Sequence, residues 1–212
     1  MELNMGQCGT PERKRVQAKK REYLRQVGFK YPGGTNLVMP GGTSETIERS
    51  LFNYKQWGVD IRKHTTYMAE IERDYAKYLK GFVKRNCRSR MIKVYKGDVF
   101  GLIHCSEILY DKNIIFSGVV ELDTPGTFLD KQMRNPWEVD NKYQTIKKLM
   151  RDGTSLIVAY GARRNGGGRG VLASYRHMAH YYGYKSKRIY FGGTNKKSHM
   201  VMMIFVKKSC CH

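Results

Sequence analysis

Arginine, lysine and tyrosine side chains are concentrated in the C-terminal part of the chain, where their chemistry is that of phosphate and base recognition. From Gly153 to His212 the sequence contains no aspartate and no glutamate. Guanidinium groups bind phosphate oxygens bidentately, and tyrosine rings stack on bases. A segment that neutralises none of its cations requires outside anions, and a phosphate backbone is the commonest source. The candidate nucleic-acid-binding residues here are Arg163, Arg164, Arg169, Tyr175, Arg176, Tyr182, Tyr184, Lys185, Lys187 and Arg188.

A glycine- and arginine-rich stretch, residues 161–170, lies in the middle of this region. It matches neither the G-x-x-x-x-G-K-[ST] phosphate loop nor a G-x-G-x-x-G dinucleotide motif followed by an acid, so it does not predict a nucleotide pocket. Two interpretations stay open: a mobile hairpin tip that grips a phosphate backbone, and a loop that is merely flexible. Glycine favours the first, because it lets backbone N–H groups approach phosphate.

Carboxylates and histidines give weaker indications of catalysis. Glu121 and Asp123 share one face of a predicted strand, as a metal-dependent nuclease would require, but turn-forming and surface acids explain them more simply. His177 and His180 would share a metal ion only on a helix, and no carboxylate lies nearby in the sequence to complete the site. We therefore assign no catalytic residue, no metal ligand and no cofactor, and lean against an enzyme.

The composition indicates a basic protein of a reducing compartment. The formal net charge of +21 destabilises the compact state by self-repulsion, which a bound polyanion would relieve. The five cysteines form no C-x-x-C pair, so free thiols are the simplest interpretation. No long apolar run and no secretory leader are visible, so we expect an intracellular protein without a membrane segment.

Three regions follow one another along the chain. Residues 1–43 predict a basic arm ending in a Gly/Pro-rich joint, and either the arm orders on a polyanion or it is a solubilising tail. Residues 44–86 predict a helical segment, with Ile61, His64, Met68 and Ile71 spaced by three or four. Residues 87–212 predict a β-rich body. The arm contributes the candidate binding residues Arg13, Lys14, Arg15, Lys19, Lys20 and Arg21.

The β-rich body is predicted from β-branched and aromatic runs that are separated by turn signals. Asp152-Gly153, between two apolar runs, is the best hairpin signal and favours antiparallel pairing. The predicted fold class is therefore α+β, with a mostly antiparallel body. The predicted strands are 91–96, 99–103, 114–122, 145–149, 156–160, 187–191 and 200–206.

Three C-terminal stretches resemble a known family: Lys142–Leu149 followed by Leu156–Val158, Lys185–Phe191, and His199–Val206. Their order is similar to the last strands of the single jelly-roll coat proteins of small viruses, especially circular single-stranded DNA viruses. The basic N-terminal arm and the size of the chain resemble that family too. The resemblance implies a jelly-roll body that packs nucleic acid in a virion, or in the nucleus or cytoplasm of a host.

These observations predict a nucleic-acid-binding structural protein, a viral coat protein or nucleoprotein, that binds backbone phosphates with little sequence preference. Two alternatives stay open: a DNA- or RNA-binding factor in replication, regulation or the ribosome, and a metal-dependent nuclease. We expect nucleic acid as the partner, preferably single-stranded, and a homo-oligomer. DNA is not distinguished from RNA.

Overall fold

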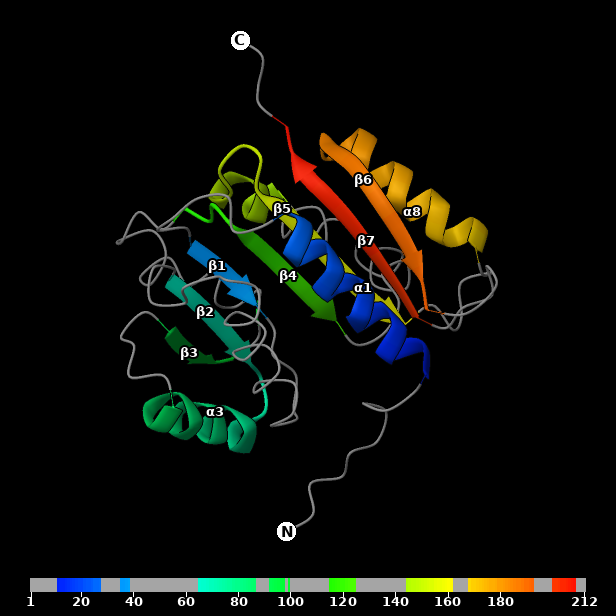
Figure 1. The fold of residues 1–212 in the computed structure, drawn as a ribbon. Helices are drawn as coiled ribbons and strands as arrows, with labels where there is room; N and C mark the ends of the chain where they lie inside the picture. The colour runs from blue at the N-terminus through cyan, green and yellow to red at the C-terminus, as the bar shows by residue number, and fades with distance from the viewer. Residues whose placement is uncertain are drawn as a thin grey trace.

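Seven strands form one sheet with helices packed against it (Figure 1). The computed structural model describes residues 11–27, 35–38, 65–86, 92–97, 99, 115–124, 144–161, 168–192 and 200–208. The strand order is β3-β2-β1-β4-β5-β7-β6. The strands are β1 (Thr35–Val38), β2 (Thr65–Glu70), β3 (Ile92–Lys96), β4 (Val119–Thr124), β5 (Ser155–Gly161), β6 (Tyr184–Phe191) and β7 (Met200–Lys207), and the helices are α1 (Pro11–Val27), α3 (Arg73–Asn86) and α8 (Gly168–Tyr181).

The first five strands run parallel to one another, and only β7 is antiparallel to its neighbours, β5 and β6. Strands that are covered on both faces read as continuous apolar runs. β7 is such a strand, since Val201 to Phe205 are all buried. The predicted α+β class with a mostly antiparallel, jelly-roll-like body is therefore wrong, and the fold is α/β.

The antiparallel prediction was wrong because it took the Asp152-Gly153 turn as a link between two strands. Asp152 and Gly153 do form a turn, with Gly153 at a φ of 82°, but the turn joins β5 to helical residues 144–149. The apolar run 145–149 had been predicted as a strand. A short apolar run has the same appearance in a buried strand and a buried helical turn, so periodicity does not separate the two.

The predicted helical segment divides into a strand and a helix where the structure describes it. The helix is confirmed for Arg73–Asn86, whose Leu79 and Val83 pack against Met68 and Ile92. It is wrong for β2, where Thr66 to Glu70 are buried in succession, as in a strand covered on both faces. Residues 44–64 lie outside the described residues. None of the described helices is both long and apolar enough to span a membrane.

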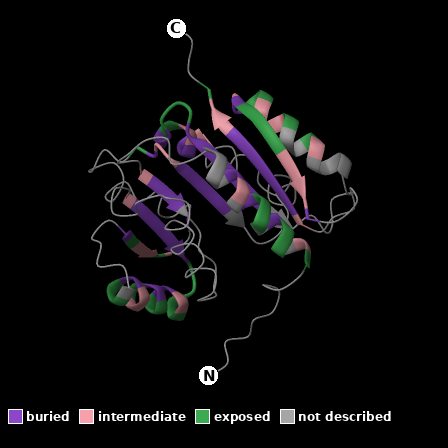
Figure 2. Cartoon of the chain, in the orientation of Figure 1, coloured by how far each residue is buried: buried purple, intermediate pink, exposed green. Residues whose placement is uncertain are grey.

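Alternate residues of the central strands point into cores on opposite faces of the sheet, and these strands are the most buried part of the molecule (Figure 2). The larger core contains Leu122, Val158 and Met203. On the other face, Ile157 and Ile204 pack against Val16 of α1. The pleat thus gives every central strand two apolar faces, which is the condition for a covered parallel sheet.

Helix α1 falls within the span predicted as a basic arm, and it packs on the sheet (Figure 1). Two polar contacts fix it there. The Lys20 ammonium group forms a buried ion pair and hydrogen bond with the Glu121 carboxylate of β4. The hydroxyls of Tyr23 and Ser155 lie 3.0 Å apart in a buried hydrogen bond. One side of this basic helix is therefore part of the folded core.

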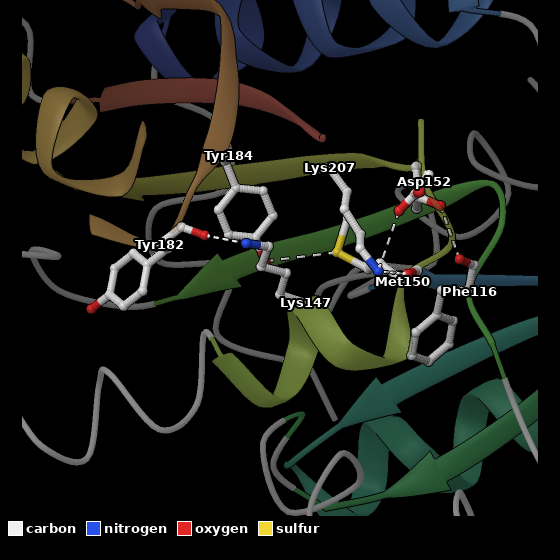
Figure 3. A network of polar contacts seen from close by, with 8 residues as sticks. Phe116, Lys147, Met150, Asp152, Tyr182, Tyr184 and Lys207 are labelled. Atoms are coloured by element: carbon white, nitrogen blue, oxygen red, sulfur yellow. Dashed lines mark hydrogen bonds and ion pairs between the residues drawn. The ribbon is translucent and has the colours of Figure 1, made fainter. Parts of the chain in front are cut away.

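A polar network ties the amino end of β5 to the carboxyl end of β7 (Figure 3). Lys207 donates to the backbone oxygen of Met150 and lies 3.6 Å from the Asp152 carboxylate. Lys147 donates to the Tyr182 backbone oxygen at 2.7 Å. Burial raises the pKa of the Tyr184 hydroxyl strongly, so this group stays neutral inside the network. The network satisfies buried polar groups, and its role is structural.

Candidate functional site

The strand order reverses direction at one place, which predicts where a ligand binds. From β1 the sheet extends through β2 and β3 on one side and through β4 and β5 on the other. In open α/β sheets, ligands bind outside the carboxyl ends of the strands at such a switch point. The candidate site therefore lies beyond the ends of β1 and β4, next to the end of β2.

Sequence adjacent to these strand ends favours close approach of a ligand to the backbone. Pro40-Gly41-Gly42 comes two residues after the end of β1, and Pro125-Gly126 directly follows β4. The glycine- and arginine-rich stretch begins at the last residue of β5. Glycine permits backbone N–H groups to approach a ligand closely. Residues 40–42, 125–126 and 162–167 lie outside the described residues, so only the connection of these stretches to the strand ends is established.

Glu70 is an acid at this edge whose side chain the structure describes. It is the last residue of β2 and is only 9% exposed. Its carboxylate accepts a hydrogen bond from the backbone N–H of Glu72 at 3.0 Å, and its backbone oxygen accepts one from Gly97 at 2.9 Å. The side chain is thus held at the carboxyl edge by the turn that leads into α3. Ile71, the next residue, is 65% exposed.

Desolvation is the main cause that raises the pKa of the Glu70 carboxyl group. The backbone hydrogen bonds from Glu72 and Ile71 oppose this effect, and the nearby Glu72 charge adds to it. A buried carboxylate of this kind gains stability from any further hydrogen-bond donor. Glu70 is therefore suited to accept hydrogen bonds from a hydroxyl-bearing ligand, with apolar surface beside it at Ile71.

The candidate binding residues of α1 differ in their exposure and in their hydrogen-bond and ion-pair partners. Lys14 is exposed, and Lys19 pairs with Glu22 at 2.7 Å. Arg15 donates to the backbone oxygen of Gly192 at 3.2 Å. Lys20 is buried and its ammonium group is paired with Glu121, so it is not available to a ligand. The side chains of Arg13 and Arg21 are not among those described.

The C-terminal candidates also divide into exposed and buried groups. Tyr182 and Tyr184, at 1% and 0% exposure, fill the larger core instead of stacking on bases. Arg188 donates to the Tyr190 hydroxyl at 2.7 Å on the exposed edge of the sheet. Arg176, Lys185 and Lys187 are exposed. Arg163 and Arg164 lie outside the described residues, as do the side chains of Arg169 and Tyr175.

The carboxylates considered for catalysis lie on β4 and the histidines on α8, so the structure does not combine the two groups in one site. Glu121 is buried with Lys20, whereas Asp123 is the second-last residue of β4, at the switch point. His177 and His180 both lie on α8, where the ring of His177 stacks on Tyr181 at 4.9 Å. The described residues contain no cluster of three or more potential metal ligands. This arrangement provides no basis for the metal-dependent nuclease.

Methyltransferases of known structure share this fold. A Streptococcus mutans protein assigned to the SAM-dependent methyltransferases matches with a TM-score of 0.62 and 9% identity, over 90% of this chain and 48% of that one. The N-methyltransferase NodS from Bradyrhizobium japonicum matches with a TM-score of 0.54 and 9% identity, over 95% and 99%. SMU.776, a methyltransferase by assignment and solved with SAH, matches with a TM-score of 0.56 and 10% identity, over 90% and 49%.

At this identity the likeness establishes the fold alone, and the chain spans about half the length of two of these proteins. No family model matches the sequence. No curated protein matches it either. The likeness nevertheless overturns the resemblance to jelly-roll coat proteins. The predicted role as a viral coat protein or nucleoprotein is therefore wrong, and neither of its two alternatives fits this fold better.

Glu70 is the functional candidate that sequence reasoning missed. The signal was present: a run of threonine, tyrosine and apolar residues, Thr65–Ala69, ends at the acid Glu70 and comes after the apolar Leu37-Val38 and the Pro40-Gly41-Gly42 stretch. A strand, a glycine-rich turn and a later acid together are typical of nucleotide-binding α/β folds. The helical interpretation of residues 44–86 hid this pattern, because it removed the strand that places the acid.

Proposed function

We propose that this chain is a methyltransferase that uses S-adenosylmethionine (SAM) as its methyl donor. The observation that carries the proposal is Glu70, a buried acid at the carboxyl end of β2 beside a topological switch point. An acid in this position hydrogen-bonds ribose hydroxyls in nucleotide-binding α/β sheets. The fold shared with solved methyltransferases, one of them a complex with SAH, supports a nucleoside of this kind.

The described residues fit the adenosine part of SAM. The Glu70 carboxylate offers acceptor oxygens to the ribose diol, and ionic acceptors form the stronger class of hydrogen bond. Ile71 follows directly with its side chain 65% exposed, which leaves apolar surface for an adenine ring. Exposure of a large aliphatic side chain beside a buried acid has a simple explanation if a nucleoside covers both.

The backbone of β4 brings Asp123 to the switch point, although its side chain is not among those described. Asp123 lies at the end of β4, on the opposite side of β1 from Glu70. Bound SAM supplies an electrophilic methyl group on a sulfonium sulfur. A nitrogen or oxygen nucleophile must present a lone pair to that carbon, and a carboxylate can orient it by accepting a hydrogen bond from its proton. On its position in the strand alone, we propose Asp123 for this orienting role.

The net charge of +21 favours an anionic substrate. Nucleic acid, predicted as the partner from the same charge, fits this requirement as the molecule to be methylated. A basic surface that concentrates a polyanion near the carboxyl edge would raise the rate of encounter. The predicted homo-oligomer stays a prediction.

Isothermal titration calorimetry with SAH tests the proposal. We expect the wild-type chain to bind SAH and Glu70→Ala to bind about 10- to 100-fold more weakly, the effect of a lost hydrogen bond to a charged group. Glu72→Ala is the matched control, because it removes a neighbouring exposed acid but keeps the backbone N–H that holds Glu70. Absence of SAH binding by the wild-type chain would refute the proposal.

A further inference from the structure

A groove runs between α8 and β6, on a different part of the molecule from Glu70. It has a volume of about 700 Å³ and is lined by cationic, polar and apolar side chains. Arg176 and His180 come from α8, Ser186 from β6, and Lys208 follows β7. Leu172 and Ile189 provide apolar surface. The nearest strands are those farthest from β2 in the sheet, so this groove is separate from the proposed nucleoside site.

A β-bulge in β6 shapes the groove. Ser186 is paired with Phe205 and Arg188 with the next residue, Ile204, so Lys187 is an extra residue in the edge strand. The extra residue lets both Ser186 and Ile189 face the groove, although they are three apart. It also leaves Lys187 exposed on the open edge. A bulge and a lysine on an edge strand both prevent pairing with another strand, so this edge is suited to a different ligand.

Among the residues that the structure describes, no carboxylate neutralises the cations around the groove. Within the part of the chain that the structure describes, no carboxylate pairs with Arg176, Lys185, Lys187 or Lys208. Lys207, by contrast, has Asp152 at 3.6 Å. Because no aspartate or glutamate occurs after Asp152, a side-chain carboxylate for any of these cations would have to come from earlier in the chain. The groove is thus a local concentration of positive charge that a bound polyanion would neutralise.

We propose that the groove between α8 and β6 binds the phosphate backbone of a single-stranded stretch of nucleic acid, the substrate of the proposed methyltransferase. Arg176, Lys187 and Lys208 contact phosphates, and His180 and Ser186 donate further hydrogen bonds. Tyr181, which is 59% exposed beside His180, offers a ring on which a base can stack. Binding to the backbone carries no base preference, so the groove positions the polymer and leaves the choice of base to the methyl-transfer site.

The direction of β6 supports a polymer over a small anion. β6 runs parallel to β5, so the strand leads from the groove at Ser186 to the carboxyl edge at Phe191, about 17 Å away at the usual rise per residue. A chain of phosphates can occupy the groove and still present a base at that edge. Few large apolar residues are exposed around the groove, Tyr181 being the one among the described residues of α8, β6 and β7, which disfavours a membrane surface.

Fluorescence anisotropy with a labelled single-stranded RNA and DNA of about 20 nucleotides, over a range of salt, tests this inference. Arg176→Ala/Lys187→Ala/Lys208→Ala should weaken binding and reduce the slope of log K against log salt by about 2, the loss of three phosphate contacts on a single strand. The matched control is Lys77→Ala/Lys80→Ala/Lys84→Ala, which removes three exposed lysines from α3. The control should keep the wild-type slope.

Equal effects of the two triple variants would overturn the inference, because the binding would then depend on total charge only. Tighter binding to anionic lipid vesicles than to either polymer would also overturn it. Because the inference rests on the proposed function for the identity of the substrate, SAH calorimetry on the same groove variant separates the two. Retained SAH binding with lost polymer binding supports both, whereas polymer binding by a chain that binds no SAH refutes only the methyltransferase.

Discussion

Glu70 and Glu121 are both buried carboxylates, and their surroundings give them different roles. Glu121 is compensated by the Lys20 ammonium group, so it contributes to folding and is not available to a ligand. Glu70 is held by the backbone N–H of Glu72, and desolvation raises the pKa of its carboxyl group. A buried carboxylate whose charge is only partly compensated by hydrogen bonds is typical of a binding site, where the ligand donates the remaining hydrogen bonds. The distinction depends on neighbours from distant parts of the chain.

The raised pKa of Glu70 predicts how SAH binding depends on pH. Ribose hydroxyls donate to the ionised carboxylate, so affinity should rise as pH increases through a pKa that lies above the ordinary value of 4.5. Calorimetry at a series of pH values should show this rise in the wild-type chain. The Glu70→Gln variant should bind weakly with no such rise, whereas Glu72→Gln should keep the rise but move it to lower pH, because the Glu72 charge adds to the raised pKa of Glu70. A rise that persists in Glu70→Gln would assign the titration to another group.

The same carboxyl group should change the stability of the unliganded protein in the opposite direction. Because its pKa is higher in the folded chain than in the unfolded one, the folded state holds more protons in the window above 4.5. The stabilisation is complete below the unfolded pKa and is lost as pH rises through the folded pKa. Unfolding by urea across this window should therefore show a smaller loss of stability in Glu70→Gln than in the wild-type chain. Equal losses in the two chains would contradict this assignment.

At the scale of elements, α1 is fastened to the sheet through a buried ion pair and a buried hydroxyl contact. Replacing Lys20 by methionine leaves the Glu121 charge buried without its main partner, which should cost about 3–5 kcal/mol of unfolding free energy. The double variant Lys20→Met/Glu121→Leu should recover most of this loss, since an apolar pair of similar size needs no compensation. Urea unfolding of the three chains measures both effects. A double variant as unstable as the single one would show that other contacts of Glu121 matter more.

Several strands could be predicted from the sequence, but the way in which they pair in the sheet could not. The strands of residues 156–160, 187–191 and 200–206 are confirmed as parts of β5, β6 and β7, because each is a β-branched or aromatic run bounded by turn residues. The parallel arrangement was missed, since it depends on crossovers between distant strands and not on any local pattern. β2 was missed because a strand buried on both faces has no alternation to set it apart from a helix. Glu70 was missed with it.

At the scale of the whole molecule, the acid-free basic region and the candidate site at Glu70 lie toward opposite ends of the sheet. The acid-free C-terminal region supplies α8, β6 and β7, which form one end of the sheet, whereas Glu70 lies toward the other end. The positive charge was evident from composition, but its role was not, because composition does not reveal that Tyr182 and Tyr184 are core residues or that Arg176 and Lys208 line one groove. A basic surface at one end of the sheet and the proposed nucleoside site toward the other end are the two parts that the proposed nucleic-acid methyltransferase requires.

The net charge of +21 also predicts how salt affects folding. Repulsion among like charges destabilises the compact state, and the Debye length falls from about 10 Å at 0.1 M to about 3 Å at 1 M salt. Thermal unfolding in sodium chloride should therefore show a melting temperature that rises over this range. Both triple variants, of the groove and of α3, should show a shallower rise, because each lowers the net charge by the same amount. A melting temperature that falls with salt would mean that exposed pairs such as Lys19–Glu22 outweigh the repulsion, and the groove would then lack the unbalanced charge on which its proposed ligand depends.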